Sequence, residues 1–134
     1  MINQQRILMF NVSKEKRDNI IQMCKTLGIL TKTVDRPQYN QKIGALAEIS
    51  GFKEDKEIYT KEEFPLEMLV FSGMNQQQVD SFLKEYKNRG IEQIGCKAII
   101  TPDNVFWTAE KLFRELLKEH TFMNNTLDGN HNIH

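Results

Sequence analysis

A few side chains of this 134-residue chain have types and spacings that permit chemistry. Lys97 stands inside an apolar segment, and Glu115 and Glu119 lie about one helical turn apart, next to His120. A lysine in such a segment needs a carboxylate partner, a path to water for its stem, or a function as an anion-binding or Schiff-base group. We expect a structural pair between Lys97 and Glu115. An enzyme would instead need Lys97 to meet Glu115 or His120 in one accessible cavity.

The other reactive side chains favour structural interpretations. Cys24 is predicted on the apolar face of a helix and Cys96 in a strand, so both thiols are expected to be buried, reduced and inert. His120 suits a solvated place at the negative end of a helix dipole. His131 and His134 have a spacing that binds a metal weakly, but a dedicated site needs further ligands. We therefore predict no metal site, no cofactor and no catalytic residue.

One stretch, residues 96–120, holds most of these groups. A short strand leads to Thr101, a candidate N-cap with Pro102 in the first helical position. Apolar residues then recur at helical spacing from Val105 to Leu116. The opposite face of this helix carries Trp107, Lys111, Arg114 and Lys118. Because Trp and Arg are enriched at interface hot spots, this face is a candidate partner-binding surface; alternatively, the Trp packs under a loop or the C-terminal tail.

The same stretch resembles a known family. The pattern K-A-x-x-T-x-x-N-x-x-W is carried by Lys97, Ala98, Thr101, Asn104 and Trp107, and residues 115–120 supply an E-L-x-x-E-H ending. Together they resemble a bacterial family known only as an uncharacterised domain of unknown function. The resemblance is best over residues 66–120. It implies membership of that family but no activity, substrate or cofactor.

The charge balance excludes some classes of partner. Eighteen basic and eighteen acidic side chains cancel, so no global field attracts nucleic acid or an anionic membrane. The chain has no apolar run near the ~20 residues of a membrane-spanning helix, and no signal-peptide core follows its first residues. Two widely spaced cysteines suggest neither a disulfide scaffold nor a zinc site. We expect a cytoplasmic protein.

Strand and helix patterns alternate along the chain. Continuous apolar runs at residues 7–10 and 68–71 predict buried strands, and weaker patterns at 29–34 and 96–101 predict two more. Helices follow Ser13 and Asn75 and end at Gly28 and Gly90. A short helix is predicted from near residue 43 to about Gly51, and residues 52–65 form a charged connector, predicted to be an exposed loop.

The two successive series of strands and helices resemble each other. ILMFNVS aligns with MLVFSGM at a separation of 61 positions, whereas the Gly-Ile pairs that end the helices are 62 positions apart. We therefore predict an α/β fold of two βαβα repeats with a small, mainly parallel, four-stranded sheet in the order 2-1-3-4. The alternative is a ferredoxin-like α+β two-layer sandwich. The domain would span residues 1–121, with units at 7–51 and 66–121 and a flexible tail at 122–134.

This architecture predicts a place for a ligand. In doubly wound sheets, ligands bind beyond the C-terminal ends of the central strands. The candidate ligand-binding residues are Asn11, Ser13, Ser72, Gly73, Thr101, Asn104 and Lys97. Capping of helix ends would equally explain the hydroxyl and amide groups among them.

Three functional classes follow from these observations. The leading hypothesis is a non-catalytic module that binds a partner protein or its own copy through the face of Trp107. The second is a domain that senses a small molecule or anion in the crevice at Ser13, Ser72 and Gly73. The third is an enzyme based on Lys97. Binding to nucleic acid or to a membrane is not expected.

Overall fold

The computed structural model describes the backbone of residues 4–130 and the side chains of residues 4–119. It contains four strands in one sheet and four α-helices. The elements are β1 (Arg6–Phe10), α1 (Lys14–Leu27), β2 (Leu30–Val34), α2 (Ile43–Leu46), β3 (Met68–Ser72), α3 (Gln76–Asn88), β4 (Cys96–Ile99) and α4 (Ala109–Asn130), with short 3₁₀ helices η1 (Arg36–Gln38) and η2 (Asn104–Phe106).

The sheet has the order β2-β1-β3-β4, which confirms the predicted order. The two apolar strands β1 and β3 are central, and β2 and β4 form the edges. The β1–β2 and β3–β4 pairs are parallel, whereas β1 and β3 are antiparallel. Arg6 therefore lies opposite Ser72, and Phe10 lies opposite Met68. The C-terminal ends of β1 and β3 point to opposite ends of the sheet.

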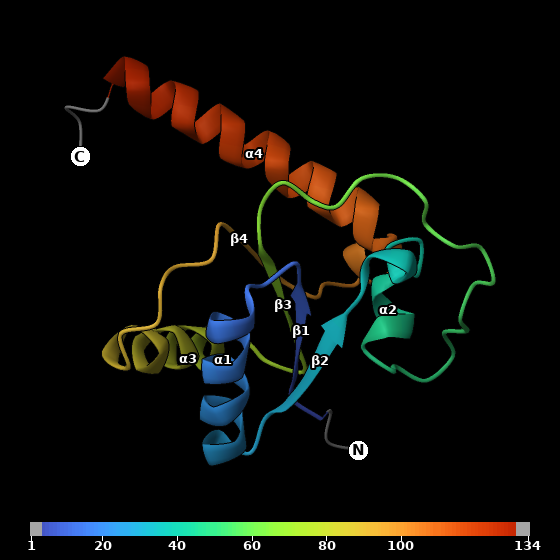
Figure 1. Ribbon diagram of the computed structural model, residues 1–134, viewed down its shortest axis with the longest axis horizontal. Helices are drawn as coiled ribbons and strands as arrows, with labels where there is room; N and C mark the ends of the chain where they lie inside the picture. Colours follow the sequence, from blue (N-terminus) through green and yellow to red (C-terminus); the bar gives the residue numbers. More distant parts are fainter. Residues whose placement is uncertain (1–3, 131–134) are drawn as a thin grey trace.

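Both faces of the sheet are covered, as Figure 1 shows. Helices α1 and α3 pack on the face that carries Ile7, Met9, Leu69 and Phe71. Helices α2 and α4, with the connector between α2 and β3, cover the other face. This arrangement differs from the two-layer alternative, because α1 and α3 lie on one face of the sheet and α2 and α4 lie on the other.

Two units repeat one order of elements: strand, helix, strand, 3₁₀ helix, helix. Unit 1 spans residues 6–46 and unit 2 spans residues 68–130. The N-caps Ser13 and Asn75 are 62 positions apart, as are Gly28 and Gly90, which both have left-handed φ values. Strands β1 and β3 also align at a separation of 62 positions. The separation of 61 suggested by the apolar runs is wrong, because it would match residues on opposite faces of the sheet.

Strands β2 and β4, and the starts of α2 and α4, are 66 positions apart, whereas the 3₁₀ helices between them are 68 positions apart. Leu30 pairs with β1 as Cys96 pairs with β3. At the start of the last helices, Ile43 N donates to Trp107 O at 2.8 Å, and Ala109 N donates to Gln41 O at 3.0 Å. The partners in these two hydrogen bonds are equivalent residues with their roles exchanged. Together with the antiparallel pairing of β1 and β3, they relate the two units by an approximate two-fold rotation.

The connector, residues 52–65, is irregular but not wholly exposed, which corrects the expected loop. Tyr59 and Phe64 are buried in it. The Phe64 ring stacks on Tyr39 with centroids 4.0 Å apart and on Phe113 of α4 at 4.2 Å. Tyr39 also donates a short hydrogen bond to Glu63. Apolar side chains spaced among charges thus anchor a segment that has no regular period.

The ends of two helices differ from the expectations. Helix α2 ends at Leu46 rather than near residue 51, and α4 begins at Ala109 rather than at Pro102. Helix α4 continues to Asn130, past the predicted boundary at residue 121, and Figure 1 shows it extending away from the sheet. Between residues 4 and 130, no helix combines the length and apolarity needed to cross a bilayer.

Candidate functional site

The turn between β4 and α4 is built from the motif residues Thr101 and Asn104. Thr101 N donates to Asn104 Oδ1 at 2.8 Å, and Asn104 N donates to Thr101 Oγ1 at 3.0 Å. Asn104 Nδ2 also donates to Ile99 O at 3.0 Å, so the buried amide is satisfied. The Thr101 hydroxyl therefore accepts from the first residue of η2 and does not cap α4. These contacts account for both residues as structural groups.

The turn projects an aromatic side chain outward. Phe106 is 62% exposed, although its ring lies 5.3 Å from the ring of Phe52, centroid to centroid. Phe52 in turn packs on Gly44 of α2, where a Cβ atom would lie only 2.7 Å from the ring. The close approach of α2 and η2 thus holds the aromatic pair at the surface.

Trp107 follows Phe106 and is half-buried. Its side chain packs against the core beneath α4, and Lys111 Nζ lies 4.7 Å from the centroid of the indole ring. Lys111, Arg114 and Lys118 are exposed along α4, and Lys118 pairs with Glu115 at 3.0 Å. We call Phe52, Phe106, Trp107 and Lys111 the aromatic surface. Some of its side chains are partly buried and others are exposed, and the indole of Trp107 is only one part of it.

The predicted crevice between the two central strands is absent from the described structure. Asn11 and Ser13 follow β1, whereas Ser72 and Gly73 follow β3, which runs in the opposite direction. The two turns therefore lie at opposite ends of the sheet. The expectation that these residues share one site is wrong. It failed because two buried apolar strands look the same in sequence whether they pair parallel or antiparallel.

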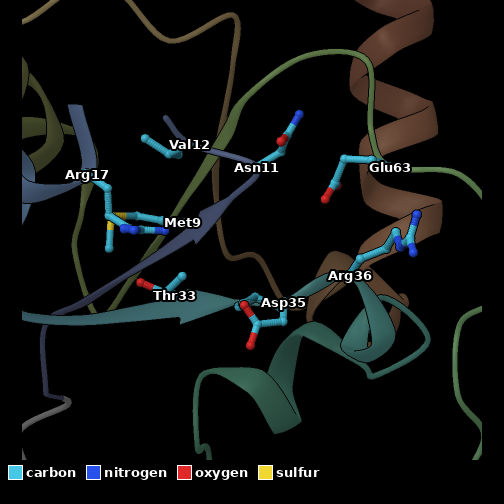
Figure 2. A pocket seen from close by; sticks show the side chains of 9 residues that line it. Met9, Asn11, Val12, Arg17, Thr33, Asp35, Arg36 and Glu63 are labelled. Carbon is cyan, nitrogen blue, oxygen red and sulfur yellow. The ribbon is translucent and has the colours of Figure 1, made fainter. Parts of the chain in front are cut away.

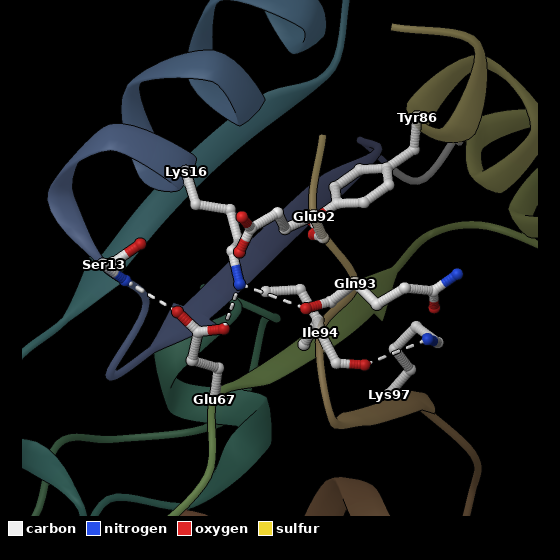
Figure 3. Close-up of polar contacts among 8 residues, drawn as sticks. All are labelled: Ser13, Lys16, Glu67, Tyr86, Glu92, Gln93, Ile94 and Lys97. Carbon is white, nitrogen blue, oxygen red and sulfur yellow. Dashed lines mark hydrogen bonds and ion pairs between the residues drawn. The ribbon is translucent and has the colours of Figure 1, made fainter. Parts of the chain in front are cut away.

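The N-terminus of α1 is occupied by a side chain of the protein itself (Figure 3). Ser13 N donates to Glu67 Oε2 at 2.8 Å, and Lys16 Nζ lies 2.5 Å from Glu67 Oε1. Lys16 also donates to Gln93 O at 3.1 Å. A carboxylate at this position complements the helix dipole. Ser13 is thus a backbone donor to an internal carboxylate.

Lys97 does not pair with Glu115. Its side chain is exposed on edge strand β4 and donates to Ile94 O at 3.1 Å (Figure 3). Because β4 alternates its side chains, Lys97 points to the face of α3, whereas Glu115 lies on α4 across the sheet. The expected pair with Glu115 is wrong because β4 is an edge strand, where the Lys97 side chain reaches water and needs no carboxylate partner. Lys97 and Glu115 therefore do not converge on one cavity.

The cysteines are buried and unpaired. Burial raises the pKa of the Cys24 thiol to about 12, although Arg89 lowers it in part. Burial also raises the pKa of Cys96. The side chain of His120, and all of His131 and His134, lie outside the described residues. Among the side chains that are described, no group of three or more His, Cys, Asp or Glu residues could hold a metal ion.

A polar cavity of about 170 Å³ lies at the C-terminal ends of β1 and β2 (Figure 2). Asn11 borders it, and is the one predicted ligand-binding residue that does so. The backbone of Asn11 is left-handed, with φ 57°, a conformation that Asn tolerates better than most residues. Gly73 has φ 71° at the equivalent position of unit 2.

Residues 67–123 match the model of a family described as a domain of unknown function (DUF3783). Over this segment the chain is similar to that family. The matched segment covers unit 2 from β3 into α4, and it contains the residues from Lys97 to Trp107. The resemblance of this part of the chain to an uncharacterised domain of unknown function is confirmed. No curated protein and no solved structure matches the chain.

Several surface and cavity residues escaped the sequence reasoning. Phe106 lies in the matched segment between Asn104 and Trp107, both of which the sequence singled out, and its position outside the apolar stripe could have identified it. Arg17 and Arg36 line the polar cavity from unit 1. Single arginines on a helix and in a turn have no distinguishing spacing. Their convergence depends on the fold of β1, α1 and β2.

Proposed function

We propose that the protein is a small cytoplasmic interaction module that associates with a second copy of itself through the aromatic surface. The observation that carries the proposal is Phe106, an aromatic side chain that is 62% exposed yet fixed against Phe52. Exposed apolar groups that adjoin one another in a patch commonly mark interaction sites. Trp107 and Lys111 extend the same surface, and Trp is among the residues most enriched at hot spots.

A second copy is favoured over other partners by charge. The chain has zero formal net charge, so two copies do not repel each other through a net field. The exposed row of Lys111, Arg114 and Lys118 offers positive groups beside the aromatic surface. The connector offers carboxylates at Glu54 and Glu57 for such a row on another copy.

The cytoplasmic location is supported by the thiols. Cys24 and Cys96 are both buried and free. Reduced cysteines are the usual state in the cytosol, whereas oxidising compartments favour disulfides. Fractionation of the cells that produce the protein tests this part of the proposal, and recovery outside the cytoplasm would contradict it.

Light scattering over a wide range of protein concentration tests self-association. We expect wild type to change from monomer to dimer and the Phe106→Asp variant to need about 30-fold higher concentration, the loss typical of a hot-spot residue. Phe106 is largely exposed, so the substitution should leave the circular dichroism spectrum unchanged.

The matched control is Leu27→Asp. Leu27 is 43% exposed and also apolar, but it ends α1, which packs on the opposite face of the sheet from the aromatic surface. This variant should dimerise like wild type. A wild-type protein that stays monomeric at every concentration would overturn the proposal, as would an equal effect of both substitutions.

A further inference from the structure

The cavity at the end of β1 and β2 is formed by unit 1 and closed by the connector. Thr33 and Asp35 come from β2 and the turn after it, Arg17 from α1, and Glu63 from the connector (Figure 2). Asn11 Nδ2 donates to Phe64 O at 2.7 Å and fastens the connector beside the opening. The volume of about 170 Å³ exceeds that of several waters at ~30 Å³ each, but is smaller than a drug-sized pocket.

Four charged side chains of both signs surround this cavity: Arg17, Arg36, Asp35 and Glu63. Within the described part of the chain, none of them forms an ion pair. Glu63 accepts hydrogen bonds from Tyr39 and from Phe64 N, but these donors are neutral. The fold holds these opposite charges apart around one small cavity. A ligand that carries both a positive and a negative group can therefore pair with both kinds of side chain.

Unit 2 provides an internal comparison. The positions equivalent to Arg17, Asp35 and Arg36 hold Val79, Thr101 and Pro102, and the position equivalent to Thr33 holds Ile99. Unit 2 nevertheless forms the same strand, helix and strand, followed by a 3₁₀ helix that begins two residues later in the turn. The N-cap of η1 is Asp35, and that of η2 is Asp103. The two arginines are therefore not required by the architecture, and a role in ligand binding explains why they occur in unit 1 alone.

We propose that this cavity binds a small zwitterion, such as a free α-amino acid, with its carboxylate on the arginines and its ammonium group on the carboxylates of Asp35 and Glu63. The sign balance of the lining favours this class over a simple anion, because a lone anion would leave the two carboxylates without a cation. The cavity volume limits the ligand to a few heavy atoms beyond the charged groups. The site is distinct from the aromatic surface, which contains none of its lining residues.

The test is a titration of the ¹⁵N-labelled full chain, followed by two-dimensional NMR, with L-alanine as the zwitterion and with acetate and methylammonium as its separate halves. We expect L-alanine to shift the amide signals of Asn11, Val12 and residues 33–36. Each half-ligand should bind at least about tenfold more weakly, because it meets only one sign of the lining.

Two substitutions and a control complete the experiment. Arg17→Gln and Asp35→Asn should each weaken L-alanine binding about tenfold, because each removes one charge. Gln suits a helix and Asn suits an N-cap, so the fold should be retained. Arg89→Gln removes an arginine that pairs with Glu85 on α3 and should change nothing. Equal binding of acetate and L-alanine with no effect of Asp35→Asn would indicate an anion site and overturn the proposal, as would the absence of localised shifts.

Discussion

Buried ionisable side chains make the stability of this protein depend on pH in the alkaline range. Burial raises the pKa of Cys24 from 9.0 to about 12 and that of Tyr86 from 10.0 to about 12. The Tyr86 hydroxyl also donates a short hydrogen bond to Glu92 O. In both cases the folded state holds the proton more tightly than the unfolded chain does. The resulting stability is fully present below pH 9 and is lost as the pH rises towards 12.

We therefore expect the free energy of unfolding to fall between pH 9 and pH 12, by at most about 1.4 kcal/mol per pH unit for each group. Urea titrations across this range measure the slope. The Cys24→Ala variant should be less stable at pH 9 and below because of lost volume, but its slope should be shallower than that of wild type. An unchanged slope would show that the thiol does not contribute.

At the same scale, single residues explain why the candidate sites were only partly predictable. Thr101 and Asn104 were recognised by type and spacing, but the spacing suited both a ligand site and a capped turn, and only their reciprocal hydrogen bonds separate the two. Arg17 and Arg36 carry no local signal at all. Their significance arises from neighbours that are distant in sequence, such as Glu63.

Among the elements, helix α2 shows how packing can reverse an intrinsic preference. Replacing a helical glycine by alanine usually stabilises by about 1 kcal/mol. At Gly44, however, the new Cβ would lie 2.7 Å from three atoms of the Phe52 ring. We expect Gly44→Ala to displace Phe52, lower the melting temperature and weaken self-association, because Phe52 supports Phe106.

Gly95 is the matched control for this prediction. An added Cβ there would lie 3.6 Å from Leu66 Cβ, an ordinary contact. Gly95→Ala should therefore leave both the melting temperature and dimerisation at or above their wild-type values. Calorimetry and light scattering on the two variants distinguish the outcomes, and equal behaviour of both would contradict the role assigned to the close approach of Phe52.

The order of the strands could be predicted from sequence patterns, but their relative direction could not. Apolar runs identified β1 and β3 as central, and capping residues located α1 and α3, because both signals are local. The relative direction of β1 and β3 is not local, since the long connection between them permits either direction. The start of α4 was misplaced because Thr101 and Pro102 form a helix-start signal that here opens a 3₁₀ turn.

For the whole molecule, contacts at several places join the two units. Strands β1 and β3 pair in the middle of the sheet, the starts of α2 and α4 exchange hydrogen bonds, and Phe64 of the connector lies between Tyr39 and Phe113. Loss of either unit would expose a central, fully buried strand to water. The two units should therefore be stable only together.

We accordingly expect a single cooperative unfolding transition in urea. Trp107 fluorescence reports on unit 2, and the NMR signals of α1 report on unit 1. Both should change with one midpoint and should agree with the circular dichroism of the whole chain. Loss of the α1 signals at a lower urea concentration than the fluorescence change would mean that the units unfold separately.

The antiparallel pairing of β1 and β3 has a consequence for the two proposed sites. The zwitterion cavity opens at the Phe10 end of β1, whereas η2 and Phe106 follow β4 at the Arg6 end. The two proposed sites share no lining residue. Most of the cavity lining comes from unit 1, whereas Phe106, Trp107 and Lys111 belong to unit 2. A substitution in either proposed site therefore leaves the side chains of the other site unchanged.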